Sequence, residues 1–144
     1  MNLIDAIDIA ASGMSAQRIR MNVISSNLAN VRTTRTPEGG PYKRKDVIFS
    51  AQPLSSFDAE FKGFLTEPLY KVDTINIIED TSEPRYEYDP SHPDANKEGY
   101  VAYPNISLSE EMVNMISASR SFEANLAIVQ SAKNMALQAV DIIR

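Results

Sequence analysis

The sequence predicts an α+β protein in which two long terminal helices pair as a coiled-coil-like hairpin around a small antiparallel β-rich segment. Two observations predict this fold. An apolar heptad pattern runs along each end of the chain, and a heptad seam requires a partner helix. The middle instead carries short β-branched runs separated by proline and glycine. We therefore expect a terminal helical domain from residues 1–31 and 106–144, and a loop and β-rich middle from residues 32–105.

The first helix is expected to begin after Asn2, which can cap it, and to continue to about Asn30. Gly13 is its one weak point, and it lies in a strip of small residues that lets another backbone approach closely. Asn27 and Asn30 lie where the helix should end, because asparagine tolerates the conformation of a helix C-cap. Seven of the eight heptad positions are apolar, and these positions are Leu3, Ile7, Ala10, Met14, Gln17, Met21, Ile24 and Leu28.

The middle segment begins with a loop, since Gly39, Gly40 and Pro41 all favour turns. Four short runs with strand composition follow, and antiparallel pairing is expected for strands joined this closely. Residues 50–68 match neither pattern and predict an irregular excursion. The expected strands are 42–49, 69–79, 85–89 and 99–104.

The last helix is expected from the capping pair Ser107 and Glu110 to the final residues, because this stretch contains no glycine or proline. Glu110 and Glu111 suit the positive end of the helix dipole. The other faces are rich in alanine and serine, and a helix that is apolar or small on several sides is typical of an assembly. The expected seam positions are Met112, Met115, Ser119, Phe122, Leu126, Val129, Lys133, Ala136, Val140 and Ile143.

Charge and composition exclude several classes of protein. The net charge of −5 is concentrated in residues 51–99, which carry four basic and eleven acidic side chains, so nucleic acid is not an expected partner. The chain has no cysteine, which excludes disulfides and thiolate metal sites. Acidic residues interrupt the first apolar run, so we expect no cleaved signal peptide, and no stretch is long enough for membrane insertion.

Catalytic equipment is sparse. His92 is the single histidine in the chain. It could form a metal site with Asp89 and Asp94, but a proline-rich surface turn is the favoured interpretation. An enzyme on a helical hairpin is therefore the remote alternative to a structural subunit, and we expect no cofactor and no small-molecule substrate. The run 43–45 is interpreted as solvated or as facing an acidic neighbour, and a plain monomeric hairpin stays open as the unassembled alternative.

Several motifs resemble those of bacterial flagellar axial proteins, the family of rod, hook and hook-associated subunits. The stretches 11–18 and 21–30 resemble the N-terminal signature of the family, and the motifs at 39–45, 88–94, 99–105 and 110–120 narrow the similarity to its proximal rod subunits. Residues 51–69 match no pattern of the family. The motif positions that carry the resemblance are Ser12, Gly13, Asn22, Asn27, Asn30, Gly39, Gly40, Pro41, Tyr42, Gly99, Tyr100, Tyr103 and Pro104.

The resemblance implies a structural subunit of the basal-body rod that polymerises through its terminal helices. Such a subunit would be exported by the flagellar type III apparatus, would assemble in the periplasm with copies of itself and other rod proteins, and would enclose the export channel while transmitting torque to the hook. Another rod or hook subunit is the nearest alternative. The short middle segment argues against the hook and the distal rod, whose subunits have larger central domains.

Overall fold

The computed structural model describes residues 3–54 and 69–142, and it confirms the predicted α+β hairpin. Asn2, Ile143 and most of the expected excursion, residues 55–68, lie outside the described residues. Within these residues, the chain forms two long helices, one near each end, and four strands between them in sequence that form two separate antiparallel pairs. The elements are α1 Leu3–Ala29, β1 Lys45–Pro53, β2 Tyr70–Glu79, β3 Arg85–Tyr88, β4 Tyr100–Tyr103 and α3 Leu108–Ile142.

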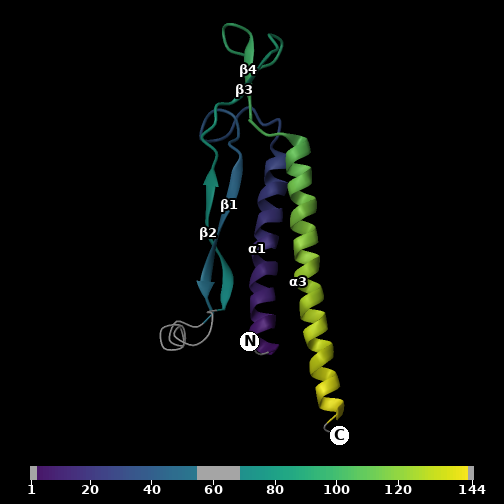
Figure 1. Cartoon of the computed structure of the whole chain (residues 1–144). Helices are drawn as coiled ribbons and strands as arrows, with labels where there is room; N and C mark the ends of the chain where they lie inside the picture. The colour runs from purple at the N-terminus through teal and green to yellow at the C-terminus, as the bar shows by residue number, and fades with distance from the viewer. Residues whose placement is uncertain (1–2, 55–68, 143–144) are drawn as a thin grey trace.

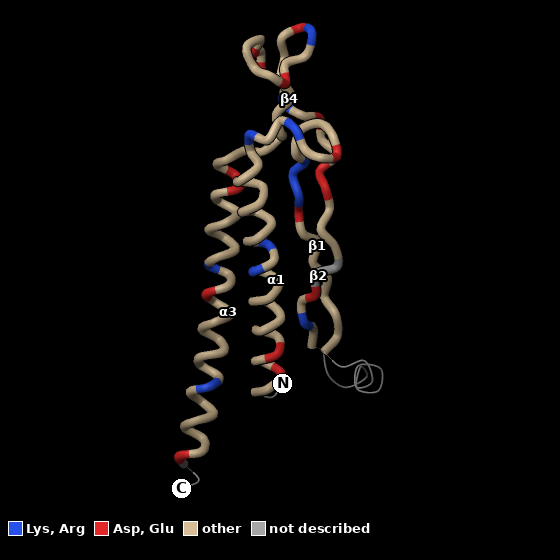
Figure 2. The backbone as a smooth tube through the Cα atoms, turned by 180° about the vertical axis from the view of Figure 1, so that it is seen from behind, with Lys and Arg blue, Asp and Glu red and all other residues tan. Residues whose placement is uncertain are grey.

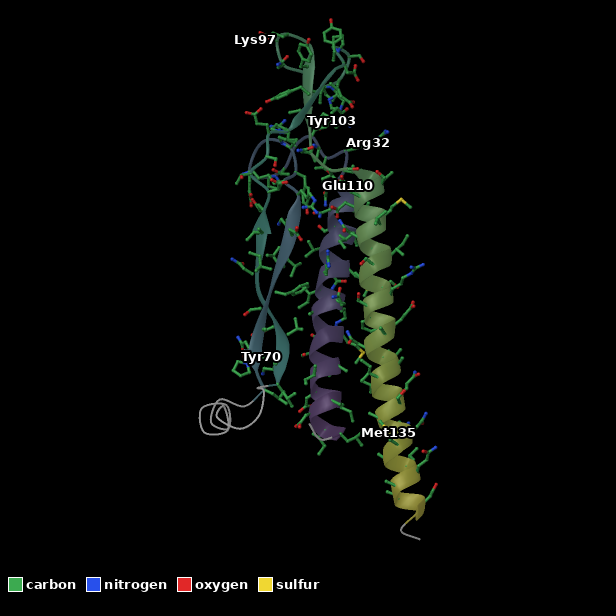
Figure 3. All side chains as sticks on the ribbon, viewed as in Figure 1. Arg32, Tyr70, Lys97, Tyr103, Glu110 and Met135 are labelled. Carbon is green, nitrogen blue, oxygen red and sulfur yellow. The ribbon has the colours of Figure 1, made fainter. Side chains whose placement is uncertain are left out.

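The helices α1 and α3 run antiparallel along most of their lengths (Figure 1). Two contacts fix their register, since Asn27 bonds to Glu111 and Gly13 faces Asn125, and both pairs have residue numbers that sum to 138. The same register places Leu3 opposite Met135, so α3 continues beyond the start of α1 from Ala136. Figure 3 shows Met135 near the lower end of α1 and the rest of α3 projecting past it.

The β1–β2 hairpin lies along the side of α1 that faces away from α3, so α1 is the middle layer of three (Figure 1). The strands pair from Lys45 opposite Glu79 to Pro53 opposite Tyr70, with one irregularity after Ile48. The hydroxyl of Ser12 ties the layers together, because it accepts a hydrogen bond from the Val72 backbone N–H at 3.1 Å. β1, at Lys45–Pro53, begins and ends later than the first expected strand, 42–49.

The β3–β4 pair forms a small arm beyond the ends of the helices (Figure 1). Tyr88 and Tyr100 meet edge to face at 5.3 Å between ring centroids. Gly99 has a φ of 82°, and a Cβ at this position would lie 2.8 Å from Tyr88 Cε2, so only glycine fits here without strain. Below the arm, Val101, Pro104 and Ile106 are buried where β4 leads into α3.

The seam of α3 differs in phase from the prediction. Met112, Leu126 and Val140 are 53%, 39% and 63% exposed, so these three predicted seam positions do not lie between the helices of the chain. The buried and half-buried positions that share the heptad of the two register contacts are Glu111, Met115, Ala118, Phe122, Asn125, Val129, Ala132 and Ala136. Of the ten predicted positions, four are retained and four are replaced by the residue one position earlier, while Val140 is exposed and Ile143 lies outside the described residues.

The reason for this shift is the size and polarity of the residues that fill the seam. Ala118 and Ala132 are 1% and 2% exposed, which brings the two helices close together. Hydrophobicity alone favours the larger Met112, Leu126 and Val140 as seam residues, although these side chains are exposed in the chain. On α1, all seven apolar heptad positions are buried or half-buried, and Ala10 and Ile24 are each 4% exposed.

Candidate functional site

A cluster of polar side chains joins the end of α1, the start of β1 and the start of α3; we call it the polar junction. It consists of Asn27, Tyr42, Arg44, Glu111 and the backbone of Lys45. Asn27 is fully buried, and its side chain uses its whole bonding capacity. Its Nδ2 donates to Lys45 O at 2.8 Å and to Glu111 Oε2 at 3.1 Å, while its Oδ1 accepts from Lys45 N at 2.9 Å and from the Tyr42 hydroxyl at 3.2 Å.

Glu111 is the second buried member of the junction, with an exposed fraction of 1%. Arg44 Nε donates to Glu111 Oε1 at 2.8 Å, and Arg44 also pairs with Asp46 at 3.4 Å. Partial burial alone would lower the pKa of Arg44, but the hydrogen bond and negative charge of Glu111 outweigh it, so the pKa is raised. The structure changes two interpretations made from the sequence. Glu111 forms an ion pair in addition to lying in the first turn of its helix. Arg44, in the basic run 43–45, finds its acidic partner within the chain.

The turn before β1 delivers Tyr42 and Arg44 to the junction. Gly39 and Gly40 have φ values of 91° and 78°, which this tight reversal requires. Tyr42 N then bonds to Thr33 O at 3.0 Å and closes the loop. On the α1 side of this loop, Asn30 stabilises the end of the helix, because its Nδ2 donates a hydrogen bond to Ser26 O at 2.8 Å.

Two exposed turns near the arm have ionised carboxylates held by serine. Asp80 accepts hydrogen bonds from the Ser82 hydroxyl and backbone, and Asp89 accepts the same pair from Ser91. These bonds lower the pKa of both carboxyls. Any stability they provide is present above the unfolded-state pKa and is lost as pH falls through the lower folded-state pKa.

The motif residue Gly13 lies on the side of α1 that faces α3, directly opposite Asn125. A Cβ built on Gly13 would lie 2.7 Å from Asn125 Nδ2 and 3.2 Å from its Cγ. The absence of a side chain at Gly13 therefore makes room for the amide of Asn125. Asn125 was not among the predicted site residues, and a polar residue beside an apolar seam was the one signal for it.

We expect Gly13→Leu to be strongly disruptive and Gly13→Ala to be mild. Leucine forces the helices apart, and overpacking costs about 1–3 kcal/mol, whereas alanine requires only that the end of the Asn125 side chain moves, and it favours the helix by about 1 kcal/mol. Swimming and basal-body yield measure both variants. The matched control is Gly13→Ala combined with Asn125→Ala, which removes the contact; equal tolerance of leucine and alanine would contradict the packing at this position.

The outer surface of α3 is apolar and carries few charges. In Figure 2 the helix is mostly tan, with charged residues widely spaced. From Ala124 to Ala132 its sequence contains no charged residue, yet Leu126 and Ile128 are 39% and 48% exposed. A surface of this kind is typical of an interaction face. The other exposed large apolar side chains on α3 are Leu108, Met112, Val113, Ile116, Met135, Leu137 and Val140.

The remaining motif residues are spread over the molecule. Asn22 is exposed on α1, and Ser12 links α1 to β2. Tyr100 and Tyr103 bound β4, whose register places them opposite Tyr88 and Arg85. The structure therefore brings Asn27 and Tyr42 together in one cluster and leaves the other motif positions in separate roles. Pro41 precedes that cluster and Pro104 is buried next to it.

His92 belongs to a surface turn. Its Nδ1 accepts a hydrogen bond from Asp94 N at 3.1 Å, and its ring contacts Tyr103 at 6.3 Å between centroids. Among the described residues, no group of three or more His, Cys, Asp or Glu side chains is arranged to hold a metal ion. Within residues 3–54 and 69–142, neither helix combines the length and hydrophobicity that a membrane span requires.

Comparisons with known proteins agree with the resemblance seen in the motifs. The family model described as "Flagella basal body rod protein" matches residues 7–35, and the one described as "Flagellar basal body rod FlgEFG protein C-terminal" matches residues 97–142. The chain is 43% identical to the flagellar basal-body rod protein FlgC of Borreliella burgdorferi over all of this chain and 99% of that relative. It is 39% identical to FlgC of Bacillus subtilis and 35% identical to FlgC of Salmonella typhimurium, in each case over 99% of this chain and at least 98% of the relative.

These similarities span the terminal helices, the polar junction and the β-rich middle alike. They confirm the predicted relationship to the proximal rod subunits. The chain therefore belongs to the FlgC family of flagellar basal-body rod proteins, and it is a structural subunit of the rod.

Proposed function

We propose that this subunit polymerises through the exposed faces of α3 and α1, with the two helices lining the wall of a tube. The carrying observation is the exposed surface of α3, where nine large apolar side chains are exposed among the residues that the structure describes. An isolated chain would leave this surface in water, whereas neighbouring helices would bury it at about 25 cal/mol for each Å² removed from water. Long helices packed side by side can tile a cylinder with continuous apolar contact.

The β-rich middle would lie further from the tube axis and contact adjacent rod proteins. The β1–β2 hairpin covers the side of α1 opposite α3, so it leaves the outer face of α3 free for other subunits. Residues 51–99 carry a strongly negative net charge, so this segment suits polar contacts with neighbours better than a place in a continuous apolar wall. In this arrangement the helical domain, residues 1–31 and 106–144, would form the tube wall, and the middle segment, residues 32–105, would lie outside it.

As a rod subunit in the basal body, the protein would serve as part of the drive shaft and of the wall around the export channel. We place its assembly in the periplasm after export by the flagellar type III apparatus, with other rod proteins and further copies of itself as partners. The terminal helices and the junction that fixes them carry this role without a catalytic group, a cofactor, nucleic acid or insertion into a membrane.

Leu126→Asp should block assembly while leaving the isolated chain folded. Leu126 is 39% exposed, so the aspartate can be hydrated in the monomer, but at a buried subunit contact its charge would cost several kcal/mol. We expect a nonmotile strain that makes the protein and lacks complete basal bodies by electron microscopy. Leu126→Met is the matched control and should swim. Normal swimming of the Leu126→Asp strain would show that this face of α3 is not a subunit contact.

A further inference from the structure

Every exposed residue of α1 lies on one narrow stripe of the helix. The exposed positions follow one another in alternating steps of four and three residues, which is the spacing of a coiled-coil seam. Each is one position later than a residue of the seam that faces α3, so the stripe lies about 100° around the helix from that seam. We call it the α1 stripe, and it consists of Ile4, Asp8, Ala11, Ser15, Arg18, Asn22, Ser25 and Ala29.

α3 carries a corresponding stripe beside its own seam. It has the same alternating steps, and it too lies one position later than residues that face α1. Four of its eight residues are large, apolar and exposed, so α3 can pack against its own α1 and against a second helix at the same time. We call it the α3 stripe, and it consists of Met112, Ile116, Ser119, Glu123, Leu126, Gln130, Lys133 and Leu137.

The charges of the two stripes select one way of pairing them. An antiparallel pairing of Asp8 with Lys133 has residue numbers that sum to 141, and the same register places Arg18 opposite Glu123. Each stripe has its acidic residue ten positions before its basic one, so a parallel pairing in step would bring like charges together. Within the described part of the chain, Asp8, Arg18 and Lys133 form no ion pair, and Glu123 has only a hydrogen bond from the Ser119 hydroxyl at 3.4 Å.

The same register also matches the sizes of the side chains. Three of the large apolar residues of the α3 stripe lie opposite small residues of the α1 stripe, which leave room for them as knobs in holes. The fourth lies opposite Ile4, which is 68% exposed in the chain and would gain an apolar neighbour. The opposed pairs are Leu126 with Ser15, Ile116 with Ser25, Met112 with Ala29 and Leu137 with Ile4.

The charges that flank the stripes are compatible with this register. Along the helix axes, none of these flanking side chains is level with a like charge. The level pairs are Asp5 with Ala136, Arg20 with Ser121 and Arg120 with Met21. Beyond the end of α1, Arg32 is level with Ser109, the residue before Glu110, so the nearest charges there have opposite signs.

We infer that the α3 stripe of one subunit binds the α1 stripe of a second copy of this chain, antiparallel and in the register that sums to 141. This inference rests on the proposed polymerisation through the exposed helix faces and specifies the partner and the pairing. The contacts within the chain sum to 138, so the second copy is displaced along the helix axis by about 4.5 Å. The same two copies therefore do not make the reciprocal contact in this register, and the contact continues from copy to copy.

Disulfide trapping tests the contact directly, because the chain contains no cysteine. The variant carries Ala11→Cys and Gln130→Cys, two exposed positions that lie opposite each other between the two ion pairs. Purified basal bodies are oxidised and separated by electrophoresis without reductant. We expect linked dimers and larger species of this chain, which reductant returns to monomers. Ser25→Cys with Gln130→Cys is the matched control; it is about 21 Å out of register and should stay monomeric.

Charge reversal gives a second measurement that needs no disulfide. Asp8→Lys should lower the yield of basal bodies several-fold, because it places two lysines opposite each other, and Asp8→Lys combined with Lys133→Asp should restore the yield. If the cysteine variant does not assemble, this restoration decides the question. A disulfide within one chain, no linked species from the first pair, or no restoration by the double reversal would overturn the contact.

The proposed function is judged separately by Leu126→Asp. If the disulfide and charge tests fail while Leu126→Asp still blocks assembly, the exposed face of α3 is a subunit contact with another partner, and only the pairing inferred here is wrong. If Leu126→Asp swims normally as well, both proposals are wrong.

Discussion

Ile24→Asp is expected to destabilise the isolated chain by about 4 kcal/mol. Ile24 is 4% exposed near the C-terminal end of α1, in the layer between the hairpin and α3. The substitution removes a buried aliphatic side chain and places a carboxylate where water does not reach it, so both the lost packing and the cost of desolvating a charge act in the same direction. Chemical denaturation followed by far-UV circular dichroism should show a much lower transition midpoint, or no folded baseline at all.

Ile4→Asp provides the matched control for this substitution. Ile4 is 68% exposed on the same helix, so the same chemical change should alter the free energy of unfolding by less than about 0.5 kcal/mol. The two variants carry the same substitution on the same helix, and the difference in burial is expected to outweigh the difference in their positions along the helix dipole. Equal stability of both would mean that α1 does not pack at Ile24 in the monomer, and that its burial depends on neighbouring subunits.

Asn27→Ala is expected to cost about 3 kcal/mol, more than the usual truncation of an asparagine. The substitution removes four hydrogen bonds, and it leaves the Lys45 backbone N–H and carbonyl and one oxygen of Glu111 without that partner. A buried carboxylate that loses a hydrogen bond is especially costly, although Arg44 still pairs with Glu111. The loss is measured as the difference in free energy of unfolding in urea.

Asn22→Ala controls for the general effect of asparagine on α1. Asn22 is exposed and lies five residues before Asn27 on the same helix, and alanine is the better helix former, so this variant should be neutral or slightly more stable. A small effect of Asn27→Ala, comparable to that of Asn22→Ala, would refute the view that the polar junction holds the three elements together.

The fold was predictable because its strongest signals are local. The heptads of 3–28 and 112–143 are long enough to specify two helices, and the prolines and glycines between them mark most strand ends. The phase of the second seam was not predictable in this way. The positions that face α1 include Ala118, Asn125 and Ala132, which have little hydrophobicity, while larger apolar residues of α3 are exposed.

The polar junction could be predicted only in part. The motifs identified Asn27 and Tyr42, but their partners Arg44 and Glu111 have local explanations as a basic run and as acids in the first turn of a helix. Nothing in the sequence indicates that residues 67 positions apart form a buried ion pair. Long-range polar contacts of this kind depend on how the elements pack, whereas periodicity describes each element separately.

The polar junction also bears on how the subunit would resist mechanical load. Torque along a shaft acts on a helical pair partly as shear, and the easiest response would be a slip of α3 past α1 by one heptad. Such a slip would place Ala118 or Ala132 against Gly13, and either small residue is compatible with close approach, so the seam itself opposes the slip weakly. The slip would, however, separate Glu111 from Asn27 and Arg44, and burying an unpaired carboxylate costs several kcal/mol. The polar junction would therefore oppose shear between the two helices more strongly than the seam itself.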